Sequence, residues 1–166
     1  MHSSSGGVFS ILAEQTIKQG GVVFGARFDE NWEVKHDYTE TIDGVSVFRG
    51  SKYVQSKTGD TFKQAEQFLK QNRKVLFSGT PCQIVALKRY LKKEYENLLL
   101  VDFICHGVPS PGVWRKYLKQ VIALTCDKNT VSSHLKLLLS ERNALVEGIS
   151  FRDKRLGWQK YSFSLT

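Results

Sequence analysis

Cysteine is scarce in this chain of 166 residues, and signals of export or membrane insertion are missing. Only three cysteines occur, without the even, dense spacing of a secreted disulfide-rich protein. The sequence contains neither an apolar run long enough to cross a bilayer nor the charged and then apolar pattern of a signal peptide. These absences predict a protein of the reducing cytoplasm without a membrane span.

Internal repeats, low-complexity tracts and recognised nucleic-acid-binding motifs are missing as well. The formal net charge of +8 permits an anionic partner, and Lys88, Arg89, Lys92 and Lys93 gather on the expected solvent side of one helix. A solvated basic face explains this better than a nucleic-acid surface, because no nucleic-acid motif accompanies it. We predict no nucleic-acid partner, whereas a phosphate-bearing cofactor fits the charge.

The composition is otherwise that of a globular chain. Hydrophobic residues make up 41% of the sequence, which is enough for one domain with a sizeable core. The sequence starts directly on a helix and stops within an alternating strand pattern. We expect residues 1–166 to form a single α/β domain that is a fragment of a larger catalytic domain.

The stretch from Lys74 to Gln83 has the pattern of an apolar strand that breaks at a glycine and restarts as a helix. Thr80 is suited to cap that helix, and Pro81 suits its first turn, where a missing N–H is no loss. Cys82 follows at the positive end of the helix dipole, which stabilises a thiolate. The pattern predicts a site for chemistry at Cys82.

A second strand, predicted over residues 98–104, also ends in a cysteine, with Cys105 and His106 followed by glycine and proline. Strand, helix and strand in this order are typical of a parallel crossover unit. Parallel strands bring their carboxyl ends to one edge of the sheet, where open α/β folds bind ligands. We expect Cys82 and Cys105 in one site there, Cys82 as the more reactive thiol, and Cys126 elsewhere without a chemical role.

The other periodicities complete an α/β fold. Residues 22–28 and 32–38 alternate as a hairpin, and residues 148–152 and 158–165 as another. The predicted architecture is a mixed sheet with a parallel β-α-β centre, helices on its faces and antiparallel edge hairpins. Further expectations are a first helix that begins with Ser3–Gly7 and stops at Gly20, and helices at about 60–72, at 81–91 and from Pro111. We also expect a short strand or extended segment at 45–48 and a weak helix at 131–139 within the poorly readable residues 125–146.

Two segments are rich in hydrogen-bond donors suited to a phosphate. Serines and glycines start the first helix, at Ser4, Ser5, Gly6 and Gly7, although the same residues are simply good caps. Residues 49–56 follow neither periodicity and indicate a loop that can hold a phosphate or a planar ring. Its candidate binding residues are Ser51, Lys52, Tyr53 and Ser56.

These motifs together resemble the coenzyme F420 hydrogenase/dehydrogenase beta subunit family. They occur in the family's order and cover about residues 3–119 and 148–163. The matching motifs are Ser3–Phe9, Gly50–Ser56, Ser78–Gln83, Asp102 with Cys105–Pro111, and Phe151–Lys154 with Gly157–Trp158.

The resemblance implies a flavin and iron–sulfur (4Fe-4S) oxidoreductase that passes electrons between clusters, FAD and an acceptor such as coenzyme F420 or ferredoxin. Many bacterial members occur in polysaccharide biosynthesis settings. The resemblance also implies that the two donor-rich segments and Thr80 bind FAD, and that Cys82 and Cys105 are catalytic or metal-binding, with His106 beside them. A ferredoxin-like module or protein is the expected electron donor, and a small molecule the redox acceptor.

The chain departs from the family in lacking the N-terminal ferredoxin-like module with its clustered cysteines. A four-iron cluster normally needs four thiolates, which three cysteines do not supply. Cys82 and Cys105 would then form a redox dithiol or contribute two ligands to a cluster completed by other sequence.

Two hypotheses from other classes stay open. A Cys82 nucleophile assisted by His106 would make the protein an acyl or phosphoryl transferase, although adjacency to Cys105 does not orient His106 as a base. The chain would otherwise be a non-catalytic fragment, whose cysteines are small buried apolar residues. Visible absorption by flavin or iron–sulfur chromophores distinguishes the redox hypothesis from both.

Overall fold

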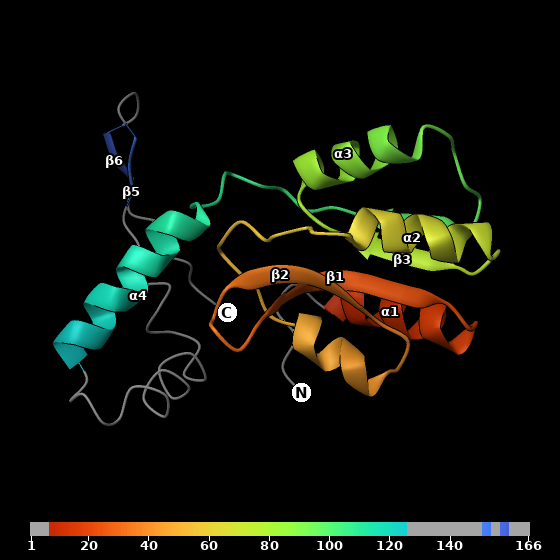
Figure 1. Cartoon of the computed structure of the whole chain (residues 1–166), viewed down its shortest axis with the longest axis horizontal. Coiled ribbons are helices and arrows are strands. Elements are labelled where there is room, and N and C mark those ends of the chain that lie inside the picture. The colour runs from red at the N-terminus through yellow and green to blue at the C-terminus, as the bar shows by residue number, and fades with distance from the viewer. Residues whose placement is uncertain (1–6, 126–150, 154–156, 160–166) are drawn as a thin grey trace. The chain divides into compact units, whose positions relative to one another are not determined.

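The computed structural model describes residues 7–125, 151–153 and 157–159 of the chain. The chain divides into two compact units, residues 1–114 and residues 115–166 (Figure 1). None of the helices in the described ranges is long and apolar enough to cross a membrane.

The first unit contains a four-stranded mixed sheet in the order β2-β1-β3-β4. β1 (Val22–Phe28) and β2 (Val34–Thr39) form the predicted antiparallel hairpin. β1 pairs in parallel with β3 (Val75–Ser78), and β3 pairs in parallel with β4 (Leu98–Val101). The predicted α/β fold with a parallel β-α-β centre is confirmed.

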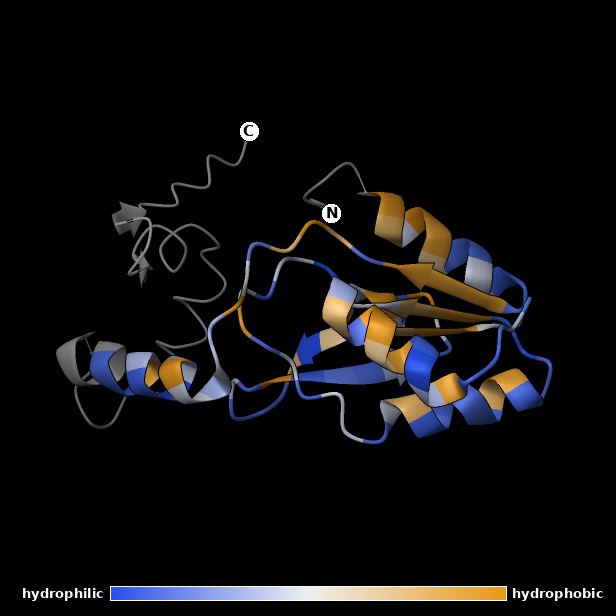
Figure 2. Cartoon of the chain, turned by 90° about the horizontal axis from the view of Figure 1, so that it is seen from above, coloured by the Kyte–Doolittle hydropathy of each residue, from blue (hydrophilic) through white to orange (hydrophobic). Residues whose placement is uncertain are grey.

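Helices cover both faces of this sheet (Figure 1). α2 (Thr61–Lys70) and α3 (Pro81–Leu91) pack on one face, and α1 (Val8–Lys18) and the short 3₁₀ helix η2 (Asp43–Phe48) pack on the other. Figure 2 shows the hydrophobic central strands between helices that carry hydrophilic residues. The α2/α3 core contains Val22, Phe24, Ala65, Leu69, Val75, Phe77, Ile84, Leu87 and Leu91, and the α1/η2 core contains Ala13, Val23, Val45, Phe48 and Leu76.

The expectation of an extended segment at 45–48 is wrong, because these residues belong to η2. A 3₁₀ helix has three residues per turn, so Val45 and Phe48 lie on the same side and are both buried against the sheet. The Phe48 ring fits against Gly25, where an added Cβ would lie only 2.8 Å from the ring. Burial of this pair favours the turn of helix over a strand.

The predicted strand at 98–104 is shorter than expected, since β4 ends at Val101. β4 is the outer strand in the order β2-β1-β3-β4, so it pairs on one side only in the described sheet. Leu99 is 43% exposed, and beyond the strand Phe103 is 57% and Ile104 87% exposed. A run of apolar residues therefore identified the strand but not its end or its place at the edge.

α4 (Pro111–Thr125) begins in the first unit and continues into the second. The second unit also contains β5 (Phe151–Asp153) and β6 (Gly157–Gln159), which pair antiparallel. The expected final hairpin therefore forms, as a two-stranded sheet. The weak helix expected at 131–139 and Cys126 lie outside the described residues.

Candidate functional site

The Cys82 turn, residues 78–83, is tightly held between two strands and a helix. β3 ends at Ser78, and the N–H of Gly79 donates to the carbonyl of Val101 at the end of β4, with an N···O distance of 3.1 Å. Thr80 caps α3, as predicted, and Pro81 occupies the first turn. Gln83 completes a capping box, because its Oε1 accepts a hydrogen bond from the Thr80 N–H at 3.0 Å.

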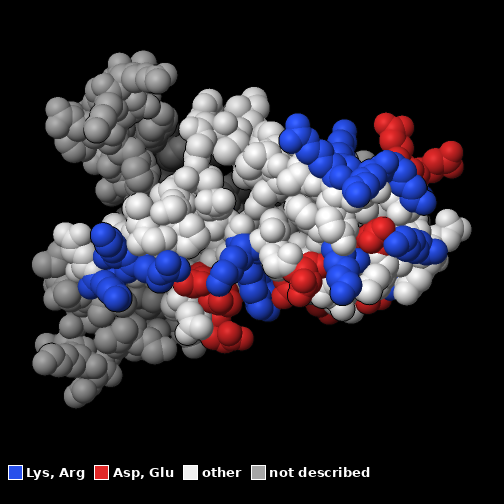
Figure 3. Space-filling view, turned by 45° about the horizontal axis from the view of Figure 1, so that its top comes forward, with Lys and Arg blue, Asp and Glu red and all other residues white. Residues whose placement is uncertain are grey.

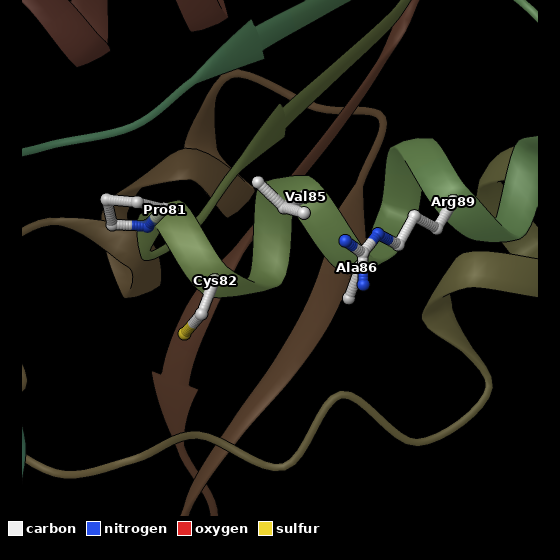
Figure 4. Close-up of a pocket in the computed structure, with 5 residues that line it drawn as sticks. All are labelled: Pro81, Cys82, Val85, Ala86 and Arg89. Atoms are coloured by element: carbon white, nitrogen blue, oxygen red, sulfur yellow. The ribbon is translucent and has the colours of Figure 1, made fainter.

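Cys82 is exposed on the first turn of α3. Its Sγ lies 3.1 Å from the Thr80 Oγ1. The thiol opens into a shallow hollow of about 610 Å³ that is also lined by Pro81, Val85, Ala86 and Arg89. Figure 4 shows these side chains along α3, with Cys82 near the start of the helix. Cys82 is thus an accessible thiol and not a buried packing residue.

Behind the Cys82 turn, His36 of β2 is buried and makes two hydrogen bonds through its ring. Its Nε2 lies 2.9 Å from the carbonyl oxygen of Ser78, and its Nδ1 lies 2.8 Å from the Ser56 Oγ. A carbonyl only accepts, so Nε2 carries the proton and Nδ1 accepts from the Ser56 hydroxyl. Burial lowers the pKa of His36, outweighing the bond to Ser78, and the ring stacks on Phe77 with centroids 5.4 Å apart.

Gln83 connects this histidine to the helix start. Its Nε2 donates to the Ser56 Oγ at 2.9 Å, while its Oε1 caps Thr80. One chain of hydrogen bonds therefore runs from Ser78 through His36, Ser56 and Gln83 to Thr80. The structure brings together Ser56, Thr80 and Cys82 of the predicted site residues. Sequence reasoning missed Gln83, although its spacing from Thr80 is that of a capping box.

The donor-rich segment 49–56 lies beside the beginning of α1. Arg49 donates from Nε to the Ser10 Oγ at 3.1 Å and pairs with Glu14 at 3.6 Å. The cap of α1 is Gly7, with φ of 75°, and it has no side chain that could cap the helix. Ser4, Ser5 and Gly6 lie outside the described residues. Arg49 is a further candidate that sequence reasoning did not single out, because its contact with Ser10 joins residues 39 positions apart and follows only from the fold.

The other candidates of this segment have different surroundings. Lys52 donates from Nζ to the carbonyls of Val47 at 3.1 Å and Arg49 at 2.9 Å, so it closes the end of η2. Ser51 and Tyr53 are exposed. Lys52 is therefore placed to hold the backbone of the segment, whereas Ser51 and Tyr53 are accessible from solvent.

Residues 102–110, which carry Cys105 and His106, have no regular secondary structure. Cys105 is half-buried and His106 is exposed. Pro109 accepts a hydrogen bond from the Gln55 N–H at 3.1 Å, and Trp114 donates from Nε1 to the carbonyl of Trp32 at 2.6 Å. The parallel pairing of β3 and β4 makes the strands before the two cysteines direct neighbours, whose carboxyl ends share an edge.

Within the described ranges, no three His, Cys, Asp or Glu side chains are grouped so that they could hold a metal ion. The described residues therefore do not provide the ligand set of an iron–sulfur cluster. No hydrogen bond among them joins Cys82 to His106; the contact of Cys82 is with Thr80.

Comparisons with known proteins agree with this fold. Residues 72–134 match the model of a family described as the C terminus of the beta subunit of coenzyme F420 hydrogenase/dehydrogenase. A chain of the F420-reducing [NiFe] hydrogenase complex from Methanosarcina barkeri, solved in a xenon derivative, has a similar fold, with a TM-score of 0.55 and 17% sequence identity. The alignment covers 70% of this chain and 43% of that chain. No match was found among curated proteins.

Proposed function

Because residues 72–134 match the model of the coenzyme F420 hydrogenase/dehydrogenase beta subunit family, we propose that the chain is part of an oxidoreductase that transfers electrons between an iron–sulfur donor and a flavin or deazaflavin acceptor. The chain spans 43% of the length of the structural neighbour described above, and in the proposal the activity is that of the whole protein. A ferredoxin-like donor, a small-molecule acceptor and a polysaccharide biosynthesis setting are parts of the same proposal.

The observation that carries the proposal is the gathering of two helix starts at one edge of the sheet. α1 ends just before β1 begins, so its start lies toward the carboxyl end of β1. α3 starts directly after β3, which runs parallel to β1. Segment 49–56 reaches both helix starts, through Arg49 to α1 and through Ser56 to Gln83 of α3.

This arrangement fits the pyrophosphate of FAD. Helix starts expose unpaired N–H groups and attract anions, and Arg49 adds a guanidinium group beside α1. In the proposal, Gly7, Arg49 and Ser51 face the phosphates, Tyr53 meets a ring, and Lys52 fixes the backbone of the segment. FAD, when bound, would supply the electron-accepting chemistry that side chains lack.

Cys82 and Cys105 have a role separate from FAD binding in the proposal. In the proposal Cys82 and Cys105 belong to one redox site, supported by their place after neighbouring parallel strands. They serve as a dithiol or as two of the ligands of a cluster that is completed by another protein or segment, because the described residues do not complete one.

The test is titration of the intact protein with FAD, followed by quenching of flavin fluorescence. We expect Arg49→Gln and Ser51→Ala to weaken FAD binding about tenfold or more, the equivalent of one charge-assisted hydrogen bond. Lys18→Gln, on the last turn of α1, is the matched control and should leave the affinity unchanged. Thermal melting verifies that each variant folds.

Unchanged affinity in Ser51→Ala and in folded Arg49→Gln would exclude segment 49–56 as part of a flavin site. The visible spectrum of anaerobically purified protein complements the titration. Absence of flavin and iron–sulfur absorption, together with no FAD binding, would favour the transferase or the non-catalytic hypothesis.

A further inference from the structure

The outer side of α3 is an apolar hollow beside a group of cations. Val85 is 49% exposed and Tyr90 44% exposed, although both are large hydrophobic residues on a helix that packs on the sheet. Cys82, Val85, Ala86 and Arg89 line the hollow (Figure 4). Basic side chains of α3 and of the residues just after it lie beside the hollow: Lys88, Arg89, Lys92 and Lys93.

The charge of this α3 surface is largely uncompensated. Elsewhere in the first unit arginines are paired with carboxylates: Arg27 with Asp37 at 2.8 Å and Arg73 with Glu40 at 2.7 Å. Within the described part of the chain, Lys88, Arg89 and Lys92 form no such ion pair, and Lys93 lies over the ring of Tyr95 at 4.4 Å.

The sequence of α3 contains no acidic residue, and Glu94 and Glu96 follow only after the helix. Figure 3 shows Lys and Arg side chains gathered at this part of the surface, with acidic side chains beside them at one end. A group of like charges that outnumbers its acidic neighbours raises a local positive potential, which attracts acidic partners over several ångströms.

We propose that the outer side of α3 docks an acidic protein, and that this protein is the electron carrier which serves the site. The identity of the acidic protein as an electron carrier rests on the function proposed above. An apolar centre that includes an arginine and is flanked by charge has the composition of a protein interface. Cys82 lines the hollow, so a docked carrier would cover the predicted redox thiol.

A protein fits this surface better than a nucleic acid. Phosphate backbones are followed by continuous tracks of cations, whereas Pro81, Cys82 and Val85 make the first half of this surface uncharged. An acidic protein with an apolar patch would match both halves, since complementary charge guides the encounter and the apolar part stabilises the complex.

The experiment measures binding of a fluorescently labelled acidic bacterial two-cluster ferredoxin to the intact protein at about 50 mM salt, where surface charges are weakly screened. The test variant is Arg89→Glu/Lys92→Glu. We expect it to weaken binding about tenfold or more, because like charges then meet across the interface. Val85→Glu, a second variant with a charge placed in the hollow, should also weaken binding about tenfold.

The matched control is Lys18→Glu/Lys74→Glu, which changes the net charge equally. Lys18 ends α1, on the other face of the sheet, and Lys74 donates to Gln19 at the same end of α1. We expect the control to bind ferredoxin within about twofold of the unmodified protein. Ferredoxin should also slow alkylation of Cys82 by iodoacetamide in the control but not in Arg89→Glu/Lys92→Glu.

Absence of ferredoxin binding, or equal weakening by test and control variants, would overturn the docking site. Binding of a duplex oligonucleotide that depends on Arg89 and Lys92, with ferredoxin binding unaffected, would identify a nucleic-acid surface instead. Since binding is measured without turnover, α3-dependent binding by a protein that takes up no FAD would uphold the docking site while contradicting the proposed function.

Discussion

The two cysteine-bearing segments look alike in sequence and differ in structure. Each follows an apolar strand and combines a cysteine with glycine and proline. The Cys82 turn follows an inner strand and is joined by hydrogen bonds to β4, to His36 and to segment 49–56. The Cys105 segment, residues 102–110, follows the outer strand of the described sheet and is largely exposed to solvent, with Ile104 87% exposed.

The difference shows what fixes a reactive group in space. At Cys82 the backbone is held by a capping box and by a buried histidine within a few residues of the sulfur. At Cys105 the hydrogen bonds of the segment lie several residues away, at Pro109 and Trp114. The first cysteine is therefore positioned by its own turn, and the second by the anchors of a longer segment.

The strongest test of this contrast is His36→Ala. The change leaves the Ser78 carbonyl unpaired and removes the ring that stacks on Phe77, so we expect the free energy of unfolding to fall by about 3 kcal/mol. Urea unfolding measures this loss. His106→Ala, in the exposed Cys105 segment, is the control and should change stability by less than about 0.5 kcal/mol. Equal losses in both variants would contradict the contrast.

Gln83→Ala should have the next largest effect. It removes the capping box and the hydrogen bond to Ser56, and we expect a loss of about 1–2 kcal/mol in urea unfolding. Gln67→Ala, at an exposed position of α2, should cost less than about 0.5 kcal/mol. Gln83→Glu should recover part of the loss, because a carboxylate accepts from Thr80 but does not donate to Ser56.

The stability should also depend on pH through His36. Burial lowers its pKa in the folded protein below the ordinary 6.5, so the unfolded chain binds a proton first as the pH falls. The contribution of neutral His36 to the free energy of unfolding is therefore complete above about pH 6.5. Below that pH the free energy of unfolding falls by at most about 1.4 kcal/mol per pH unit, until the pKa of His36 in the folded protein is reached. Urea unfolding between pH 7.5 and 5 should show this slope in His106→Ala and lack it in His36→Ala.

The smallest effect is expected at Ile104. Because its side chain is 87% exposed, Ile104→Ser should change the free energy of unfolding by less than about 0.5 kcal/mol. Ile84→Ser, the same substitution at a buried position of α3, should cost about 3 kcal/mol or more. A large decrease in the free energy of unfolding of Ile104→Ser would mean that residues 102–110 are packed in the folded protein, against the contrast between the two cysteine segments.

Local patterns predicted the elements of the first unit well. Alternation identified the β1–β2 hairpin, and the order of strand, helix and strand identified the parallel pair β3 and β4. Thr80 and Pro81 marked the start of α3 because capping depends on neighbouring residues. These features are encoded within a few residues, so they are visible without the fold.

The parts that escaped prediction depend on residues distant in sequence. His36 and Ser78 are 42 residues apart, and Ser56 and Gln83 are 27 apart, so their hydrogen bonds follow only from strand order. The same holds for the end of β4, because an outer strand and an inner strand share one apolar pattern. In the candidate site, Cys82 and Thr80 were therefore foreseeable, and the network behind them was not.

The indole of Trp114, hydrogen-bonded to Trp32, makes the tip of the β1–β2 hairpin a tether for the chain that follows β4. Trp32 itself has φ of 60°, a backbone conformation that few residues other than glycine adopt. The hairpin tip and the start of α4 are thus mechanically linked. A displacement of the hairpin tip, by a bound protein or a bulky substitution, would therefore displace the C-terminal end of the Cys105 segment without contact to either cysteine.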